Sequence, residues 1–173
     1  MLDLTAGSAL ATAEAVMGEG VSITERNDFT LTQVAGFGKG FEKDLAEVVG
    51  KLPAKPGTVA GGGGHQVFRI APQQFWVVAA QAPALPATCL VTPLSSSRCR
   101  IQIEGPKARN LLARCAAVDF SEKALRPGHF VMTGIHHTPV LIHCVEKNSF
   151  HIYAMRSFAL SVWETLEDAA HGL

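Results

Sequence analysis

The sequence predicts an α+β fold built from duplicated β-α-β-β units, with antiparallel sheets and helices packed on one face of each sheet. Two observations favour this fold. An alternating strand at residues 98–104 runs through Gly105-Pro106 into a helix at residues 107–116. The same succession of strand, glycine turn, helix and hairpin occurs about 70 residues earlier, a spacing that suits a duplicated unit and is too long for a solenoid repeat.

The chain is predicted to consist of an arm and one domain. Residues 1–20 are rich in alanine and glycine and lack the positive n-region of a signal peptide, so we expect a flexible arm that orders on a partner. Residues 21–173 then form the domain. Its first repeat covers about residues 25–85 and its second repeat about residues 89–173.

The first repeat is predicted from period-two alternation, glycine and proline breaks, and one helical pattern. The apolar positions of the helix are Phe41, Leu45, Val48 and Val49, and Gly50 ends it. The predicted elements are a short strand at 21–24, a strand at 29–35, a helix at 40–49 and a hairpin over 66–80 whose second strand, around Trp76, is buried.

The second repeat begins with a strand whose alternation is clear. Its polar residues, which include Arg98 and Arg100, alternate with Cys99, Ile101 and Ile103, so one face is expected in water and the other in a core. The remaining elements are an extended segment at 89–93, a helix at 107–116, a hairpin with arms at about 130–145 and 150–154, and a C-terminal helix lined by Ala159, Val162, Trp163, Leu166 and Ala170.

Composition excludes several classes of function. The formal net charge is zero, so there is no electrostatic case for a nucleic-acid or anionic-membrane partner. No apolar run approaches the length of a membrane span. The four cysteines lack C-x-x-C spacing, and we expect reduced, buried thiols in a cytoplasmic protein. These cysteines are Cys89, Cys99, Cys115 and Cys144.

Two glycine-rich stretches resemble phosphate loops only in part. The segment Gly36 to Gly40 follows a strand and opens a helix, but Phe41 stands where the third glycine of G-x-G-x-x-G would fall. Gly61 to Gly64 could cradle a phosphate through backbone N–H groups, yet no Lys or Ser/Thr follows at the spacing of a P-loop. A tight turn and a hairpin edge or bulge are the favoured interpretations.

Five histidines near the second hairpin are candidate metal ligands. If the hairpin turns around residue 147, His143 lies opposite His151, and two imidazoles could bind zinc. Cys144 points to the other face of its strand, and no carboxylate completes the set. Histidines in solvent or at the edge of the core are the alternative. The five are His129, His136, His137, His143 and His151.

The remaining candidates do not form an active site. Ser95 to Ser97 lack a G-x-S-x-G context, and Asp119 is suited to forming a turn. Three arginines could bind a carboxylate or lie on solvated surfaces, and two tryptophans are suited to a core. These residues are Arg98, Arg100, Arg156, Trp76 and Trp163. The residues alone therefore assign no catalytic, cofactor-binding or metal-binding position.

Four segments resemble the gamma subunit of heterotetrameric sarcosine oxidase over about residues 21–170. They are AGGGGHQVFRIAPQQFWVV, RIQIEGPKARNLLARCAAVDF, RPGHFVMTG and NSFHIYAMRSFALSVWETLEDAA. The most specific parts are Gly105-Pro106-Lys107-Ala108, Asp119, Pro127-Gly128, and Arg156-Ser157-Phe158-Ala159 with Trp163.

The pattern is more distantly similar to the folate-binding domain of the glycine-cleavage aminomethyltransferase. That resemblance implies the same fold of duplicated β-α-β-β units. It also implies a catalytic Asp near the hairpin of the second half. The matching segment here, TGIHHTPVLIHCV, contains no carboxylate. This departure argues against aminomethyl transfer by this chain alone.

The resemblance implies a non-catalytic subunit of a complex that oxidatively demethylates N-methylglycine, or a related N-methyl amino acid, and passes the one-carbon unit to tetrahydrofolate. FAD, FMN, NAD and tetrahydrofolate are then expected on partner subunits, which would be alpha, beta and delta chains, with a zinc on delta. An isolated chain is expected to expose an apolar patch and to self-associate. The alternatives are a stand-alone tetrahydrofolate-binding or aminomethyl-transferring protein, and a metal-binding module at His143 and His151.

Overall fold

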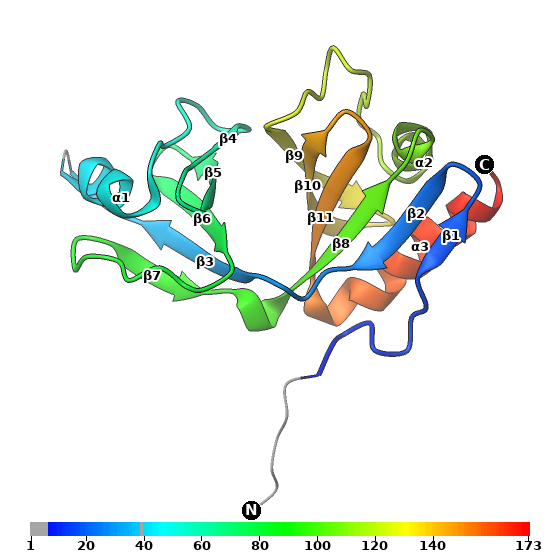
Figure 1. Ribbon diagram of the computed structural model, residues 1–173, viewed down its shortest axis with the longest axis horizontal. Helices are drawn as coiled ribbons and strands as arrows, with labels where there is room; N and C mark the ends of the chain where they lie inside the picture. The colour runs from blue at the N-terminus through cyan, green and yellow to red at the C-terminus, as the bar shows by residue number, and fades with distance from the viewer. Residues whose placement is uncertain (1–6, 39) are drawn as a thin grey trace, which may run out of the picture.

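Two antiparallel sheets face each other, with one helix on the outer face of the first sheet and two helices on the outer face of the second, so the molecule has four layers (Figure 1). The structure is a computed structural model that describes residues 7–38 and 40–173. None of the helices in these residues combines the length and the apolar composition needed to cross a membrane.

The first sheet has five strands in the order β4-β5-β6-β3-β7. Helix α1 (Phe41–Val49) covers its outer face, where Phe41, Leu45 and Val49 pack against Val34 and Phe75. The predicted helix and hairpin of the first repeat are therefore confirmed. The strands are β3 (Thr30–Ala35), β4 (Val59–Ala60), β5 (Gln66–Ala71), β6 (Gln74–Ala79) and β7 (Leu90–Pro93).

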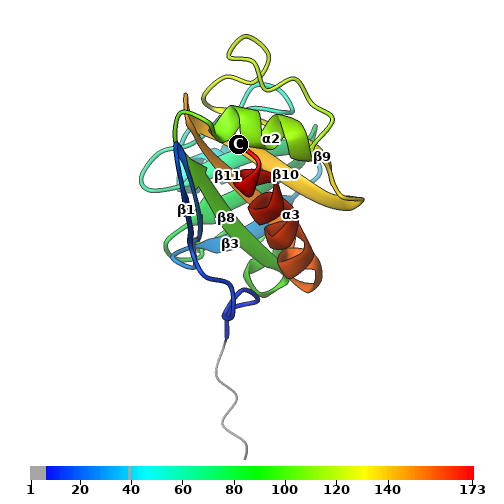
Figure 2. The same cartoon turned by 90° about the vertical axis from the view of Figure 1, so that its right-hand side faces the viewer.

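The second sheet has six strands in the order β1-β2-β8-β11-β10-β9. Helices α2 (Ala108–Cys115) and α3 (Ala159–His171) lie side by side on its outer face (Figure 2). Ile101, Leu111 and Trp163 are among the buried residues that join them to the sheet. The strands are β1 (Val16–Gly18), β2 (Val21–Glu25), β8 (Arg98–Glu104), β9 (His129–Ile135), β10 (Thr138–Glu146) and β11 (Ser149–Met155).

The order of the strands confirms the duplicated α+β fold. In the first sheet β5, β6 and β3 are neighbours, and in the second sheet β10, β11 and β8 repeat that arrangement. The position beside β3 is taken by β7, and the position beside β8 is taken by β2. The chain crosses between the sheets twice, once from β2 to β3 and once from β7 through the short helix η1 (Ser95–Ser97) to β8 (Figure 1).

The segment predicted as an N-terminal arm is partly included in the second sheet. Residues 1–6 lie outside the described residues. Beyond them Leu10 is buried, and Val16–Gly18 forms strand β1, which pairs with β2. The second-sheet half therefore combines residues from before and after the first repeat, because β1 and β2 precede β3 in the sequence.

The predicted hairpin arm at 130–145 is two strands rather than one. A tight turn at His136 and His137 separates β9 from β10, and both residues have positive φ angles, of 45° and 67°. Such turns usually contain Asn or Gly, because other side chains are strained there. Because neither residue is Asn or Gly, the sequence did not indicate a turn between β9 and β10.

The Gly105-Pro106 turn has a structural reason for its glycine. Gly105 has a φ of 125°, and a Cβ atom there would lie 2.4 Å from the carbonyl oxygen of Gly20. The same Gly20 oxygen accepts a hydrogen bond of 2.9 Å from the Lys107 N–H. This hydrogen bond holds the start of α2 against the turn between β1 and β2. The two segments are so close that only glycine fits at position 105.

Candidate functional site

The inner faces of the two sheets meet in an apolar cluster. The ring centroid of Phe68, in the first sheet, lies 5.5 Å from that of Phe130 and 5.6 Å from that of Tyr153, both in the second sheet. The cluster joins the two repeats and fills one part of the space between them. Its buried members are Leu31, Phe68, Trp76, Val78, Phe130, Leu141 and Tyr153.

Polar side chains occupy another part of the same space. Arg100 is 7% exposed, so the prediction that its face of β8 lies in water is wrong at this position. The physical reason is the first sheet, which covers that face. His143 lies opposite His151 in the β10–β11 register, as predicted, and their ring centroids are 6.3 Å apart. The ring of Phe68 packs edge-on against His143 at 4.9 Å.

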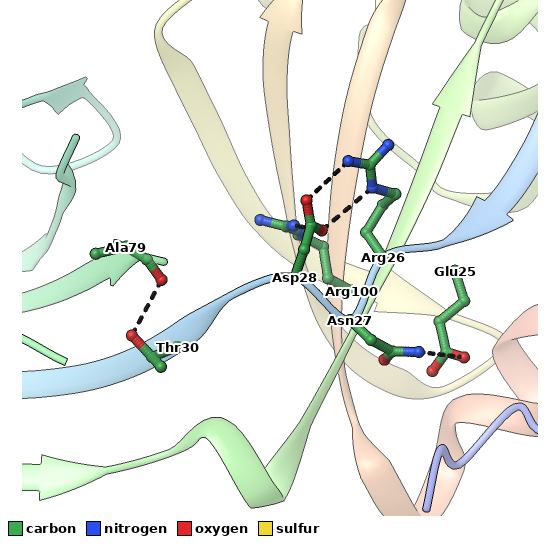
Figure 3. A network of polar contacts seen from close by, with 7 residues as sticks. All are labelled: Glu25, Arg26, Asn27, Asp28, Thr30, Ala79 and Arg100. Carbon is green, nitrogen blue, oxygen red and sulfur yellow. Dashed lines mark hydrogen bonds and ion pairs between the residues drawn. The ribbon is translucent and has the colours of Figure 1, made fainter. Parts of the chain in front are cut away.

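Asp28 links two arginines at the point where the chain passes from β2 to β3 (Figure 3). Its carboxylate accepts hydrogen bonds from Arg26, at 2.8 and 3.2 Å, and from Arg100, at 2.7 Å. The bonds from Arg26, together with the charge of Arg100, hold the pKa of Asp28 well below its usual range. The guanidinium of Arg100 also lies 4.4 Å from the ring centroid of Phe29.

Burial lowers the pKa of both inner histidines. The pKa of His143 falls to about 3, through burial and then through the charge of His151. The pKa of His151 falls to about 4, through burial and then through the charges of Arg100 and Arg26. Within the described residues, the Nδ1 atom of each ring is buried without a hydrogen-bond partner. Burial also raises the pKa of Tyr153 to about 12.

The low pKa values of His143 and His151 limit the chemistry that these two residues can perform. A general base works best when its pKa is near the operating pH, and neither imidazole meets that condition near neutrality. Cys144 lies in the core beneath the helices, on the opposite face from His143, as predicted. Among residues 7–38 and 40–173, no group of three or more His, Cys, Asp or Glu side chains could hold a metal ion.

The other candidate residues have structural roles. The carboxylate of Asp119 accepts a hydrogen bond of 2.8 Å from the Ser121 N–H, which forms the predicted turn. Gly61 to Gly64 form the loop between β4 and β5 rather than a strand edge or bulge, and Trp76 and Trp163 are buried, as predicted for the two tryptophans. The glycines before α1 form a loop in which Lys39 lies outside the described residues.

Sequence reasoning did not identify Asp28 as a candidate site residue. The residue becomes part of an ion network because β2 and β8 are neighbours in the second sheet, and that pairing joins segments more than 70 residues apart. The hairpin pattern was sufficient to pair His143 with His151, because both lie on one local unit.

The class of fold is that of the aminomethyltransferase folate-binding domain. The glycine cleavage system aminomethyltransferase T from Bartonella henselae superposes with a TM-score of 0.65 and 16% sequence identity. The superposition covers 85% of this chain and 45% of that one. No family model matches the chain.

Two further comparisons identify closer relatives. A chain of heterotetrameric sarcosine oxidase from Corynebacterium sp. U-96, solved in complex with pyrrole 2-carboxylate, superposes with a TM-score of 0.85 and 25% identity over 96% of this chain and 95% of that one. Sarcosine oxidase subunit gamma from the same strain is 30% identical over 128 residues, which are 68% of this chain and 62% of that subunit.

The subunit gamma of Corynebacterium sp. strain P-1 is 29% identical over 143 residues, 76% of this chain and 70% of the relative. The matched region therefore spans between 62% and 70% of the length of these two relatives. The chain is a homologue of the sarcosine oxidase gamma subunits, as its sequence motifs predicted.

We expect Asp28→Asn to destabilise the chain by about 1–2 kcal/mol, because Arg100 would then be buried without a counter-charge. The expected loss of unfolding free energy is small because the Asp28 side chain is 62% exposed and its charge is screened by water. Urea unfolding measures the change. Glu122→Gln is the matched control, since it removes one partner of the exposed Lys147 pair and should alter stability little. Equal effects of the two variants would contradict the proposed role of Asp28.

We also expect the free energy of unfolding to fall as the pH drops below about 6.5. The folded pKa values of His143 and His151 lie below the unfolded value, so the unfolded chain binds more protons in this range. Each imidazole contributes a slope of about 1.4 kcal/mol per pH unit, which ends near its folded pKa, and the full contribution is present above about pH 7.

Urea unfolding between about pH 4.5 and 7.5 measures this slope. His143→Gln should remove part of it, and His171→Gln, at the exposed end of α3, should leave it unchanged. A slope that is the same in wild type and His143→Gln would show that the buried imidazole is not its source.

Proposed function

We propose that this chain is a non-catalytic structural subunit of a sarcosine-oxidase-like complex. The observation that carries the proposal is the superposition on a chain of heterotetrameric sarcosine oxidase, with a TM-score of 0.85 over nearly the full length of both chains. Two gamma subunits that are 30% and 29% identical to this chain over the matched residues support the same role.

The chemistry of the inner faces supports an assembly role. The buried imidazoles have pKa values far below neutrality, which makes them unsuited to proton transfer. The segment 133–145, where the aminomethyltransferase resemblance implies a catalytic Asp, has the sequence TGIHHTPVLIHCV and no carboxylate. In the structure this segment forms the end of β9, the histidine turn and most of β10.

The complex would demethylate N-methylglycine, or a related N-methyl amino acid, and transfer the one-carbon unit to tetrahydrofolate in the cytoplasm. Its FAD, FMN, NAD and tetrahydrofolate would be bound by alpha, beta and delta partner subunits. This chain would contribute a rigid surface to the assembly. The four stacked layers, with sheets joined by two short crossings, suit that task (Figure 1).

Exposed apolar side chains support the existence of docking surfaces. Leu90 is 57% exposed and Val91 is 47% exposed, and both lie on β7, the strand at one edge of the first sheet. At the start of α3, Phe158 is 48% exposed and Leu160 is 45% exposed. Side chains of this kind are often covered by a partner, and they favour self-association when the chain is isolated.

We expect the full-length tagged chain, purified from its native host, to elute as a large complex together with flavin-containing chains. Size-exclusion chromatography monitored in the visible range, where flavins absorb, measures this, and mass spectrometry identifies the partners. An unrelated tagged protein from the same host is the control for carry-over.

Recovery of the chain as a lone monomer without flavoprotein would contradict the proposal. The competing function, a stand-alone tetrahydrofolate-binding or aminomethyl-transferring protein, rests on the fold shared with the aminomethyltransferase. Calorimetry with tetrahydrofolate on the isolated chain separates the two. Saturable heat from a monomer would favour the competing function, and its absence together with co-purification would support the subunit role.

A further inference from the structure

A cavity of about 420 Å³ lies between the two sheets, beside the apolar cluster. Trp76 of β6 forms one wall, and Leu141 and Tyr153 of β10 and β11 form the other. Met132 of β9, which is 60% exposed, lies at the rim. The inner faces of the two repeats therefore do not fill the whole space between them.

Arg98 is the charged side chain among the residues that line this cavity. Its guanidinium carbon lies over the ring of Trp76, 5.5 Å from the ring centroid, which is within the range of a cation–π interaction. Partial burial lowers the pKa of Arg98 below its usual value. The cavity thus combines one partly buried cation with an aromatic wall.

The charge of Arg98 has no counter-charge in the described part of the chain. Its guanidinium donates hydrogen bonds to the carbonyl and the hydroxyl of Ser97, at 3.2 and 3.3 Å, and it forms no ion pair. Glu25 lines an adjacent hollow together with Arg98. Its carboxylate oxygens already accept hydrogen bonds from Ser8, Asn27 and Cys99.

The lining residues include no Asp or Glu, so the cavity favours a negatively charged ligand. The planar guanidinium binds a carboxylate through two parallel N–H donors, and this pairing is strongest where water is excluded. His137, in the strained turn between β9 and β10, adds another polar group at the rim. Apart from these groups, the walls are mainly apolar.

We propose that this cavity binds a small organic carboxylate with a flat, apolar body. The carboxylate pairs with Arg98, and the body lies between Trp76 and Leu141. A volume of about 420 Å³ is near the lower end of the range of small-molecule sites, so the ligand has the size of a one- or two-ring compound. The inference does not depend on the proposed subunit role.

Calorimetry on the full-length chain tests the proposal with two probes of the same shape, naphthalene-2-carboxylate and naphthalene-2-carboxamide. The carboxylate should bind at least about tenfold more tightly than the uncharged amide, because only the carboxylate forms the charge-assisted pair with Arg98. Arg98→Gln should remove this difference and leave the affinity for the amide unchanged.

Arg126→Gln is the matched control, because Arg126 is exposed and its Nε donates only to the carbonyl of Lys123 within its own loop. Its affinity for the carboxylate should equal that of the wild type. Met132→Glu is a second test that avoids the packed interior, since the rim side chain is largely exposed. The new carboxylate should compete for Arg98 and weaken carboxylate binding about tenfold or more.

Unfolding by urea confirms that each variant is folded before titration. Three results would overturn the proposal. They are no saturable binding of the carboxylate at millimolar concentration, equal affinity for carboxylate and carboxamide, and Arg98→Gln binding the carboxylate as tightly as Arg126→Gln does.

Discussion

The packing of the two sheets against each other is the interaction on which the rest of the structure depends. Helix α1 covers the outer face of the first sheet, and α2 and α3 cover the outer face of the second, while the two inner faces pack against each other. The contact of Phe68 with Phe130 and Tyr153 supplies the apolar part. The buried polar residues Arg100 and His143 and the cavity beside Arg98 lie in the same space between the two sheets.

The local elements could be predicted from the sequence, and their long-range placement could not. The strand at 98–104 and the helix after it follow from periodicity and from the Gly105-Pro106 break. Periodicity identified the polar face of that strand, but not the second sheet that buries Arg100. The turn at His136 was missed because its positive φ is held by the surrounding hairpin rather than by a glycine.

In the candidate site, too, the local features could be predicted from the sequence and the long-range ones could not. The pairing of His143 with His151 followed from the register of one hairpin, and the possible role of an arginine in binding a carboxylate followed from residue type. The desolvation of both imidazoles, the Asp28 bridge and the cavity beside Arg98 depend on residues from both repeats. The low pKa values of the buried imidazoles and the absence of Asp and Glu from residues 133–145 are the observations that favour the proposed assembly role over aminomethyl transfer.

The central claim, that the chain supports assembly and does not take part in the chemistry, is tested most directly in the reconstituted complex. Partner subunits would be combined with wild-type chain or with the His151→Gln variant, and N-methylglycine oxidation would be measured per assembled complex. The account predicts equal turnover for the two complexes and no turnover from this chain alone. A variant complex of normal size that has lost turnover would contradict it.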